Sequence, residues 1–191
     1  MESGLIASHF AANKKVVERS AESLRAVAED VARALVKALS EGRKVIAFGN
    51  GGSAAQASHF VGELLGRFKE TRQPFPAIAL ASDGGTVTCI SNDFGYEELF
   101  GRQIEALAQA GDICFGFTTS GRSENVRRGL ERARARGAVT VAVTGEAGLS
   151  GGDADYVVAV PSDVTAHVQE VHLMLLHVWC IYVDEQLGRT R

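Results

Sequence analysis

Five short apolar runs punctuate the chain, and each is followed by a more polar segment. Most of the runs are continuously apolar rather than alternating, which is typical of strands that are covered on both faces of a parallel sheet. The predicted strands cover residues 44–49, 76–81, 112–117, 138–143 and 156–161.

Helical patterns lie between and around these runs. Residues 4–40 form one or two amphipathic helices ahead of the first strand, and the apolar segment 165–187 is long enough for a closing helix. The alternation of strand and helix predicts a three-layer α/β/α, doubly wound domain around a five-stranded parallel sheet. The intervening helices are predicted at residues 53–69, 96–109 and 122–136.

Composition narrows the class of protein. A chain of 191 residues suits one domain spanning residues 1–191, and its net charge of -3 gives no general attraction to nucleic acid or to a membrane surface. No apolar stretch reaches the roughly 18 residues that cross a bilayer. Three scattered cysteines do not form a disulfide framework or a zinc ribbon. We therefore expect a cytoplasmic protein without a nucleic-acid or membrane partner.

Two loops rich in glycine and hydroxyl groups follow predicted strands. "GNGGS" covers residues 49–53, and "TTSGRSENV" covers residues 118–126. Parallel sheets bind ligands at the carboxyl ends of their strands, and backbone amides at helix starts bind anions. Either loop alone could be a tight turn with a helix cap, for instance by Ser53 in the first loop. Two such loops after neighbouring strands favour a ligand that carries phosphate.

The stretch "SHFVGELLGRF" places His59 and Glu63 four residues apart, on one face of a predicted helix. Such a pair is often only a surface contact. A carboxylate in apolar surroundings can also serve as a general base, and a histidine or metal beside it can polarise a carbonyl group. Arg67 follows one turn after Glu63 in the same predicted helix.

The remaining histidines allow more than one interpretation. His172 and His177 lie in the apolar closing helix, where a hydrogen-bonded core histidine is the usual assignment. His177 is also a candidate acid or metal ligand. His9 and His167 are expected at the surface or at an interface.

The motifs "GNGGS", "HF..EL.GRF", "NDFG", "TSGxSxNV" and "QEVHxxxxH" occur in this order, and the chain resembles the sugar isomerase (SIS) domain family from about residue 40 to 187. Among its members it is most similar to the phosphoheptose isomerases. The resemblance implies a flavodoxin-like sheet and a homotetramer with active sites shared between subunits. It also implies that residues 1–40 form a helical segment that packs on the domain and at the oligomer interface.

The resemblance also implies roles for individual residues. Glu63 corresponds to the general base and His177 to the general acid. Zinc-bearing members hold one Zn²⁺ per subunit at positions matching His59, Glu63, Gln169 and His177, and no nucleotide cofactor is implied. The residues implied to bind the phosphorylated sugar substrate are Asn50, Gly51, Gly52, Ser53, Glu63, Arg67, Asn92, Asp93, Thr118, Thr119, Ser120, Ser123 and Gln169.

The geometry of a helix leaves open whether Gln169 and His177 bind the same metal ion. Gln169 and His177 are eight residues apart, roughly 12 Å along a helix, so a single ion binds both only if their side chains lean together. His172 is the nearer neighbour of Gln169 within one chain, and pairing across subunits is an alternative.

Several positions depart from the family pattern. Arg122 and Glu124 stand where an amide and a small residue are usual, His167 replaces a common arginine, and Thr118 replaces a serine. An additional cation at Arg122 would favour a more anionic substrate.

The resemblance implies an aldose–ketose isomerase that converts D-sedoheptulose 7-phosphate to D-glycero-D-manno-heptose 7-phosphate through an enediol, the first step of activated-heptose synthesis. Two alternatives are an isomerase of another sugar phosphate and a non-catalytic SIS-type regulator that binds a sugar phosphate. Related regulators lack the final histidine of the "QEVHxxxxH" motif, so His177 favours catalysis.

Overall fold

The computed structural model describes residues 4–69, 71–149 and 154–188, so the extreme ends of the predicted domain lie outside the described residues. Its sheet has five parallel strands in the order β2-β1-β3-β4-β5, which is the flavodoxin-like order. The predicted sheet is therefore confirmed. The strands are β1 (Val45–Gly49), β2 (Ala77–Ala79), β3 (Ile113–Thr118), β4 (Val139–Thr144) and β5 (Tyr156–Ala159).

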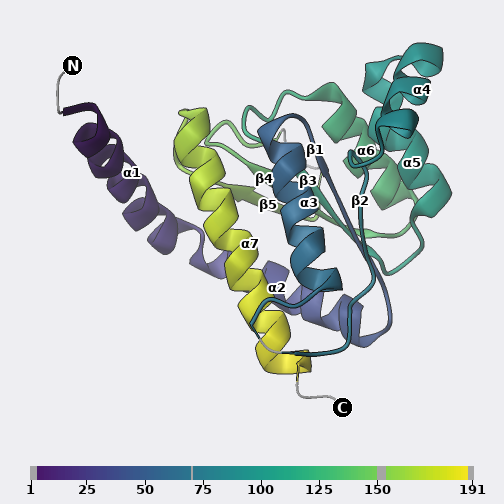
Figure 1. The fold of residues 1–191 in the computed structure, drawn as a ribbon, viewed down its shortest axis with the longest axis horizontal. Helices are drawn as coiled ribbons and strands as arrows, with labels where there is room; N and C mark the ends of the chain where they lie inside the picture. Colours follow the sequence, from purple (N-terminus) through teal and green to yellow (C-terminus); the bar gives the residue numbers. More distant parts are fainter. Residues whose placement is uncertain (1–3, 70, 150–153, 189–191) are drawn as a thin grey trace.

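Helices cover both faces of the sheet, which confirms the three-layer architecture (Figure 1). One hydrophobic cluster joins a sheet face to α2, α3 and α7, and a second joins the other face to α4, α5 and α6. The N-terminal α1 extends from the body beside α7 (Figure 1). The helices are α1 (Gly4–Ser23), α2 (Arg25–Ser40), α3 (Gly52–Leu65), α4 (Gly84–Phe94), α5 (Leu99–Leu107), α6 (Glu124–Ala135) and α7 (Thr165–Leu187), and a 3₁₀ turn covers Tyr96–Glu98.

Helix α4 is absent from the sequence prediction. Its sequence is rich in glycine, threonine and serine, and Ile90 is its one buried residue, so it carries no clear apolar stripe. The side chain of Asp83 fixes its start by accepting hydrogen bonds from the backbone amides of Gly85 and Thr86. A cap, rather than hydrophobic periodicity, therefore specifies this helix.

Strands β1 and β3 are neighbours, but the helices that follow them lie on opposite faces. Helix α3 packs with the first cluster and α6 with the second. The sheet therefore has its topological switch point between β1 and β3, where folds of this kind bind ligands. Space is tight there, because a Cβ atom on Gly49 would lie 2.8 Å from the carbonyl oxygen of Phe117.

A buried aromatic cluster sets the positions of α3 and α7. Phe60 from α3 and Trp179 from α7 both pack on Phe115 of β3, with ring centroids 5.1 and 5.3 Å from it. The indole of Trp179 donates a hydrogen bond of 3.1 Å to the carbonyl oxygen of Ala28 in α2. These contacts hold α3 and α7 side by side on one sheet face. Among the described helices, none has the length and apolar character required to span a membrane.

Candidate active site

The loop after β1 is fixed by a network of amide groups. Asn50 donates to the Asn125 side-chain oxygen at 2.8 Å and accepts from the Asn125 amide at 2.9 Å. The hydroxyl of Tyr96 also donates to the Asn50 side-chain oxygen, at 2.8 Å. Asn125 and Tyr96 are additions to the predicted set. Asn125 lies in the quoted "TSGxSxNV" motif, but nothing in the sequence marks Tyr96 as a partner of Asn50.

Helix α3 begins differently from the prediction. Its N-cap is Gly51, with φ of 54°, and Ser53 is already inside the first turn, so Ser53 is not the capping residue. The positive φ favours glycine at this position. Gly52 is also constrained, because a Cβ atom there would lie 2.6 Å from the side-chain nitrogen of Gln169. The start of α3 therefore packs directly against Gln169 of α7.

The loop after β3 gathers hydroxyl groups at the start of α6. The hydroxyl of Thr118 donates to that of Ser123 at 3.0 Å, and the backbone amide of Arg122 donates to the Ser120 hydroxyl at 3.2 Å. Ser123 is the N-cap residue of α6, yet its side chain makes no capping hydrogen bond. Its hydroxyl instead accepts the hydrogen bond from Thr118 within the loop.

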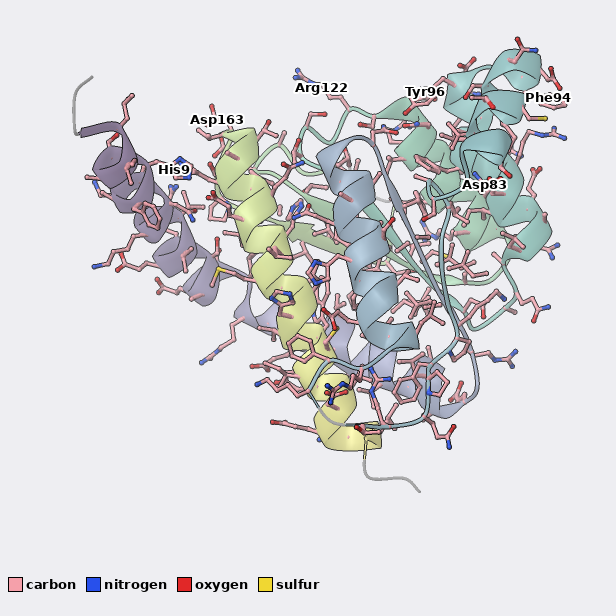
Figure 2. The ribbon with its side chains drawn as sticks, viewed as in Figure 1. His9, Asp83, Phe94, Tyr96, Arg122 and Asp163 are labelled. Carbon is pink, nitrogen blue, oxygen red and sulfur yellow. The ribbon has the colours of Figure 1, made fainter. Side chains whose placement is uncertain are left out.

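The same loop packs closely against the segment that follows β4. Gly121 has φ of 65°, and a Cβ atom at this position would lie 1.9 Å from the carbonyl oxygen of Gly148. Thr119 accepts a backbone hydrogen bond of 3.1 Å from Gly145. These contacts fix the curve of the loop, with the half-buried Ser120 at its turn. Arg122 points outward on the rim that also carries Tyr96 (Figure 2).

Helices α3 and α7 bring three charged or ionisable side chains together. His59 lies 2.9 Å from a carboxylate oxygen of Glu63, and the Nε2 atoms of His59 and His177 are 3.4 Å apart. One potential ligand atom from each of these residues lies within 4.8 Å of the others. Two imidazoles and a carboxylate match the nitrogen and oxygen donors that a divalent metal such as zinc accepts. The predicted i, i+4 pair is thus part of a possible metal-binding group.

The environment of His177 favours its neutral form. Partial burial lowers its pKa first, the neighbouring His59 lowers it further, and Glu63 opposes both effects. The ring of Phe68 stacks against it with centroids 5.5 Å apart. A neutral imidazole near pH 7 can exchange a proton with a substrate oxygen or bind a metal.

His172 does not join this group. It is fully buried, its Nε2 donates to the carbonyl oxygen of Thr144 at 3.1 Å, and its ring lies near Phe117. Burial lowers the pKa of His172 to about 4. The alternative in which His172 is the ligand beside Gln169 is therefore wrong within this chain, and the core interpretation holds.

Other predicted residues lie at the edge of this arrangement. The backbone carbonyl of Gln169 accepts a 2.5 Å hydrogen bond from Gln56, while its side chain faces Gly52. The exposed pair Asn92 and Asp93 lies in the last turn of α4, where the Asn92 amide donates to Asp93 at 2.8 Å. Among the described residues, no hydrogen bond joins this pair to the loop after β1, but Tyr96 shortly after it reaches Asn50.

Arg67 lies beyond the end of α3. The helix ends at Leu65 with Gly66 as its C-cap, although residues 53–69 were predicted as one helix. The prediction was wrong in length because Gly66 adopts a backbone conformation, with φ of -87° and ψ of -112°, that cannot continue a helix. Arg67 is exposed and follows the bend, so it does not continue the polar face of His59 and Glu63.

Comparison with known proteins identifies close relatives. The sequence pattern of the SIS domain matches residues 8–145. A phosphoheptose isomerase of Aquifex aeolicus is 48% identical over 91% of this chain and 95% of its own. The structure of a phosphoheptose isomerase from Francisella tularensis superimposes with a TM-score of 0.91 at 36% identity, covering 97% of this chain and 100% of that one. A phosphoheptose isomerase structure from Neisseria gonorrhoeae gives 0.86 at 34% identity, covering 94% and 97%.

Proposed function

The chain belongs to the SIS-domain family and, within it, to the phosphoheptose isomerases, and on this premise we propose that it converts D-sedoheptulose 7-phosphate to D-glycero-D-manno-heptose 7-phosphate. The observation that carries the proposal is the group of His59, Glu63 and His177 on helices that meet beside the switch point. This reaction is the first step in making activated heptose.

Glu63 acts as the base that moves the carbon-bound proton. Its carboxylate takes a proton from C1 of the ketose, the C2 oxygen gains a proton, and an enediol forms. Loss of the proton from the C1 oxygen and return of a proton to C2 then give the aldose. His177, kept neutral by its surroundings, exchanges the oxygen-bound protons. Both groups are within reach of one small substrate, because their ligand atoms lie within 4.8 Å.

The two loops hold the substrate from either side of the switch point. The hydroxyls of Thr118, Ser120 and Ser123 and the amides at the start of α6 suit a phosphate group. Across the crevice, the fixed amide of Asn50 suits the sugar hydroxyls. Further substrate contacts are assigned to Gly51, Gly52, Ser53, Arg67, Asn92, Asp93, Thr119 and Gln169 on the basis of family resemblance.

One Zn²⁺ per subunit fits the donor set of His59, Glu63 and His177. The family resemblance adds Gln169 as a fourth ligand. A bound divalent ion would polarise the carbonyl group and stabilise the enediolate oxygen. The assignment of Gln169 rests on the family resemblance, because within one subunit its side chain lies against Gly52, about two helical turns before His59.

Assembly into a homotetramer with shared active sites accompanies this function. Leu5, Ile6 and Phe10 on α1 are 77%, 77% and 71% exposed, an unusual display of large apolar side chains on one helix. A subunit interface over α1 would cover them.

A turnover assay tests the proposal. Metal-stripped protein, with and without added Zn²⁺, is incubated with sedoheptulose 7-phosphate, and the aldose is followed by NMR. We expect aldose to form, and parallel rates with pentose and hexose phosphates to be lower. Binding of the sugar phosphate without any turnover would instead indicate a regulator, and faster turnover of a shorter sugar would replace the proposed substrate.

The base is tested by Glu63→Gln. We expect a fall of roughly 10²–10⁴-fold in kcat, the usual range for a lost general base. Glu131→Gln, at an exposed site on α6, is the matched control and should leave kcat unchanged. Intact turnover in Glu63→Gln would overturn the assignment of Glu63 even if the substrate proved correct.

A further inference from the structure

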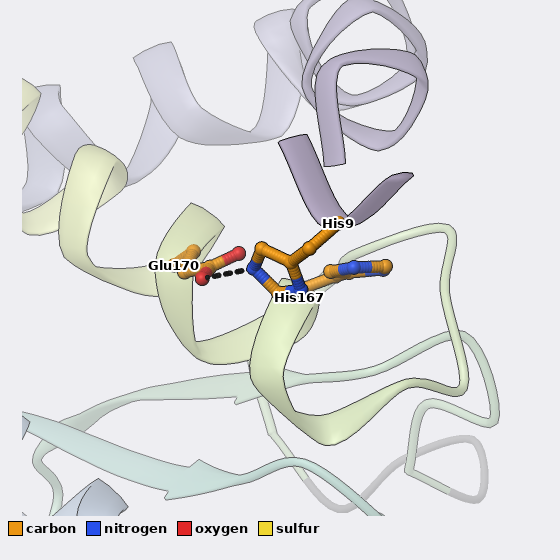
Figure 3. Close-up of side chains that lie close together, drawn as sticks. All are labelled: His9, His167 and Glu170. Atoms are coloured by element: carbon orange, nitrogen blue, oxygen red, sulfur yellow. Dashed lines mark hydrogen bonds and ion pairs between the residues drawn. The ribbon is translucent and has the colours of Figure 1, made fainter. Parts of the chain in front are cut away.

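A second group of metal-ligating side chains lies where α1 meets the start of α7 (Figure 3). His9 comes from α1, and His167 and Glu170 come from α7. One potential ligand atom from each lies within 4.8 Å of the others. His9 Nε2 is 2.9 Å from Glu170 Oε1, and the two imidazole rings have centroids 4.9 Å apart.

This group is separate from the candidate active site. Glu170 precedes His177 by seven residues, which corresponds to roughly 10 Å along the helix axis. The two groups share none of the three residues that each contributes, although Gln169, which family resemblance assigns to the first site, precedes Glu170 directly in the chain. A single ion cannot bind both.

The group contains a carboxylate oxygen that lacks a partner. Oε2 of Glu170 is buried and makes no hydrogen bond with any part of the chain that the structure describes. The Glu170 side chain as a whole is 42% exposed, but this one oxygen is shielded from water, and a shielded acceptor without a partner is unfavourable. His167 beside it is also buried, at 8% exposure. A cation between these side chains would satisfy the free oxygen.

The donor chemistry selects the ion. Two imidazoles and one carboxylate, without a thiolate, form a three-ligand set of the kind that binds Zn²⁺ and leaves one position open to water. The His-x-x-Glu spacing places His167 and Glu170 on one face of α7, since residues three apart are neighbours on a helix. Tetrahedral binding at about 2.1 Å brings ligand atoms to roughly 3.4 Å from one another, so the side chains need only close slightly.

An ion can also reach the group from solvent. A groove of about 830 Å³ between α1 and the segment before α7 is lined in part by His167. His9 is exposed on the outer side.

We propose that His9, His167 and Glu170 form a second divalent-cation site, selective for Zn²⁺ or a similar transition metal, that fastens α1 to α7. The buried residues of α1 are Val16 and Ser20, both in its C-terminal half. The half that carries His9 has no buried residue among those described, so within one subunit the ion would be its main attachment to the body.

Metal counting tests the site. Full-length, metal-stripped protein is titrated with Zn²⁺ by calorimetry, and bound metal is measured after gel filtration. We expect two equivalents per chain in the wild type and one in His9→Gln, with isomerase turnover of His9→Gln unchanged. The exposed Lys14→Gln on the same helix is the matched control and should keep two equivalents.

Two further measurements separate the alternatives. His167→Gln should lose the same equivalent as His9→Gln, whereas His59→Gln should lose the other. Zn²⁺ should also slow proteolysis within residues 4–15 of the wild type and of His59→Gln, but not of His9→Gln. A single equivalent in the wild type, or two in folded His9→Gln, would overturn the proposal. If the wild type showed no turnover, the proposed function would be contradicted, but the number of Zn²⁺ equivalents bound per chain would still test the second site.

Discussion

His172 is a buried titratable group whose proton has only one favourable position. Its Nε2 donates to the Thr144 carbonyl, while Nδ1 is buried without a hydrogen-bond partner among the described residues. Protonation would place a second proton on Nδ1 in an apolar setting, which explains why burial lowers the pKa of His172 to about 4. Sequence reasoning anticipated a core histidine but could not name Thr144, since that partner lies 28 residues away.

This histidine makes stability depend on pH. Its pKa in the folded state lies below its ordinary value of 6.5, so the unfolded chain binds more protons between about pH 6.5 and 4. The free energy of unfolding should therefore fall as pH decreases through that window, by about 3 kcal/mol at most from this group. Urea unfolding at pH 7 and pH 5 measures the effect. His172→Gln should show a smaller difference between the two pH values, and an equal difference would contradict this origin.

Replacing Gly52 should disturb the candidate active site while the fold stays intact. An added Cβ would collide with the Gln169 side chain at 2.6 Å, so Gly52→Ala should move Gln169. We expect kcat/KM and Zn²⁺ affinity to fall by roughly tenfold or more, as when a metal-site neighbour is disturbed. Gly62→Ala on the same helix meets nothing within 4 Å and is the control. It should retain activity and gain up to about 1 kcal/mol, because alanine favours the helix. Equal activities in the two variants would refute a steric role for Gly52.

At the scale of elements, hydrophobic periodicity predicted the buried strands and the helices that cover them. It missed α4, whose start depends on the side chain of Asp83, and it extended α3 through Gly66. It also could not show that Tyr96 reaches Asn50 or that His9 meets α7, since both contacts join residues far apart in the chain. The motifs indicated which loops matter, but packing between elements decides which side chains meet.

The cap of α4 gives a prediction for this helix. Asp83→Ala removes the acceptor for the Gly85 and Thr86 amides, so amide exchange in α4 should accelerate several-fold while that in α6 stays constant. Hydrogen exchange with mass spectrometry measures both helices. Asp83→Asn keeps a side-chain acceptor and serves as the control. Unchanged exchange in Asp83→Ala would show that packing alone holds α4.

The contact of α3 with the sheet gives a prediction about stability. Phe60 is fully buried against Phe115, so Phe60→Ala should lower the free energy of unfolding by about 3–5 kcal/mol. Phe94→Ala is the control, because Phe94 is 48% exposed. It should cost far less, and chemical denaturation compares the two. A small loss in Phe60→Ala would mean that the aromatic cluster does not hold α3.

At the scale of the whole molecule, the apolar face of α1 bears on assembly. Replacing Ile6 with Glu places a charge among Leu5 and Phe10 and should dissociate the proposed tetramer. Light scattering after gel filtration measures the mass, and turnover should fall with dissociation if, as proposed, the subunits share active sites. Lys15→Glu, a polar change on the same helix, is the control. A monomeric wild type would contradict the proposed assembly.

The position of α7 in the chain also has a consequence for the order of events during synthesis. Every other described element precedes α7, so α3 emerges from the ribosome with His59 and Glu63 before His177 exists. Until α7 follows, Phe60 and Phe115 lack the covering contact of Trp179, and the sheet face beneath them is open. Burial of this face and completion of the group of His59, Glu63 and His177 therefore both depend on α7, so a nascent chain that lacks α7 has neither a complete core nor a complete site.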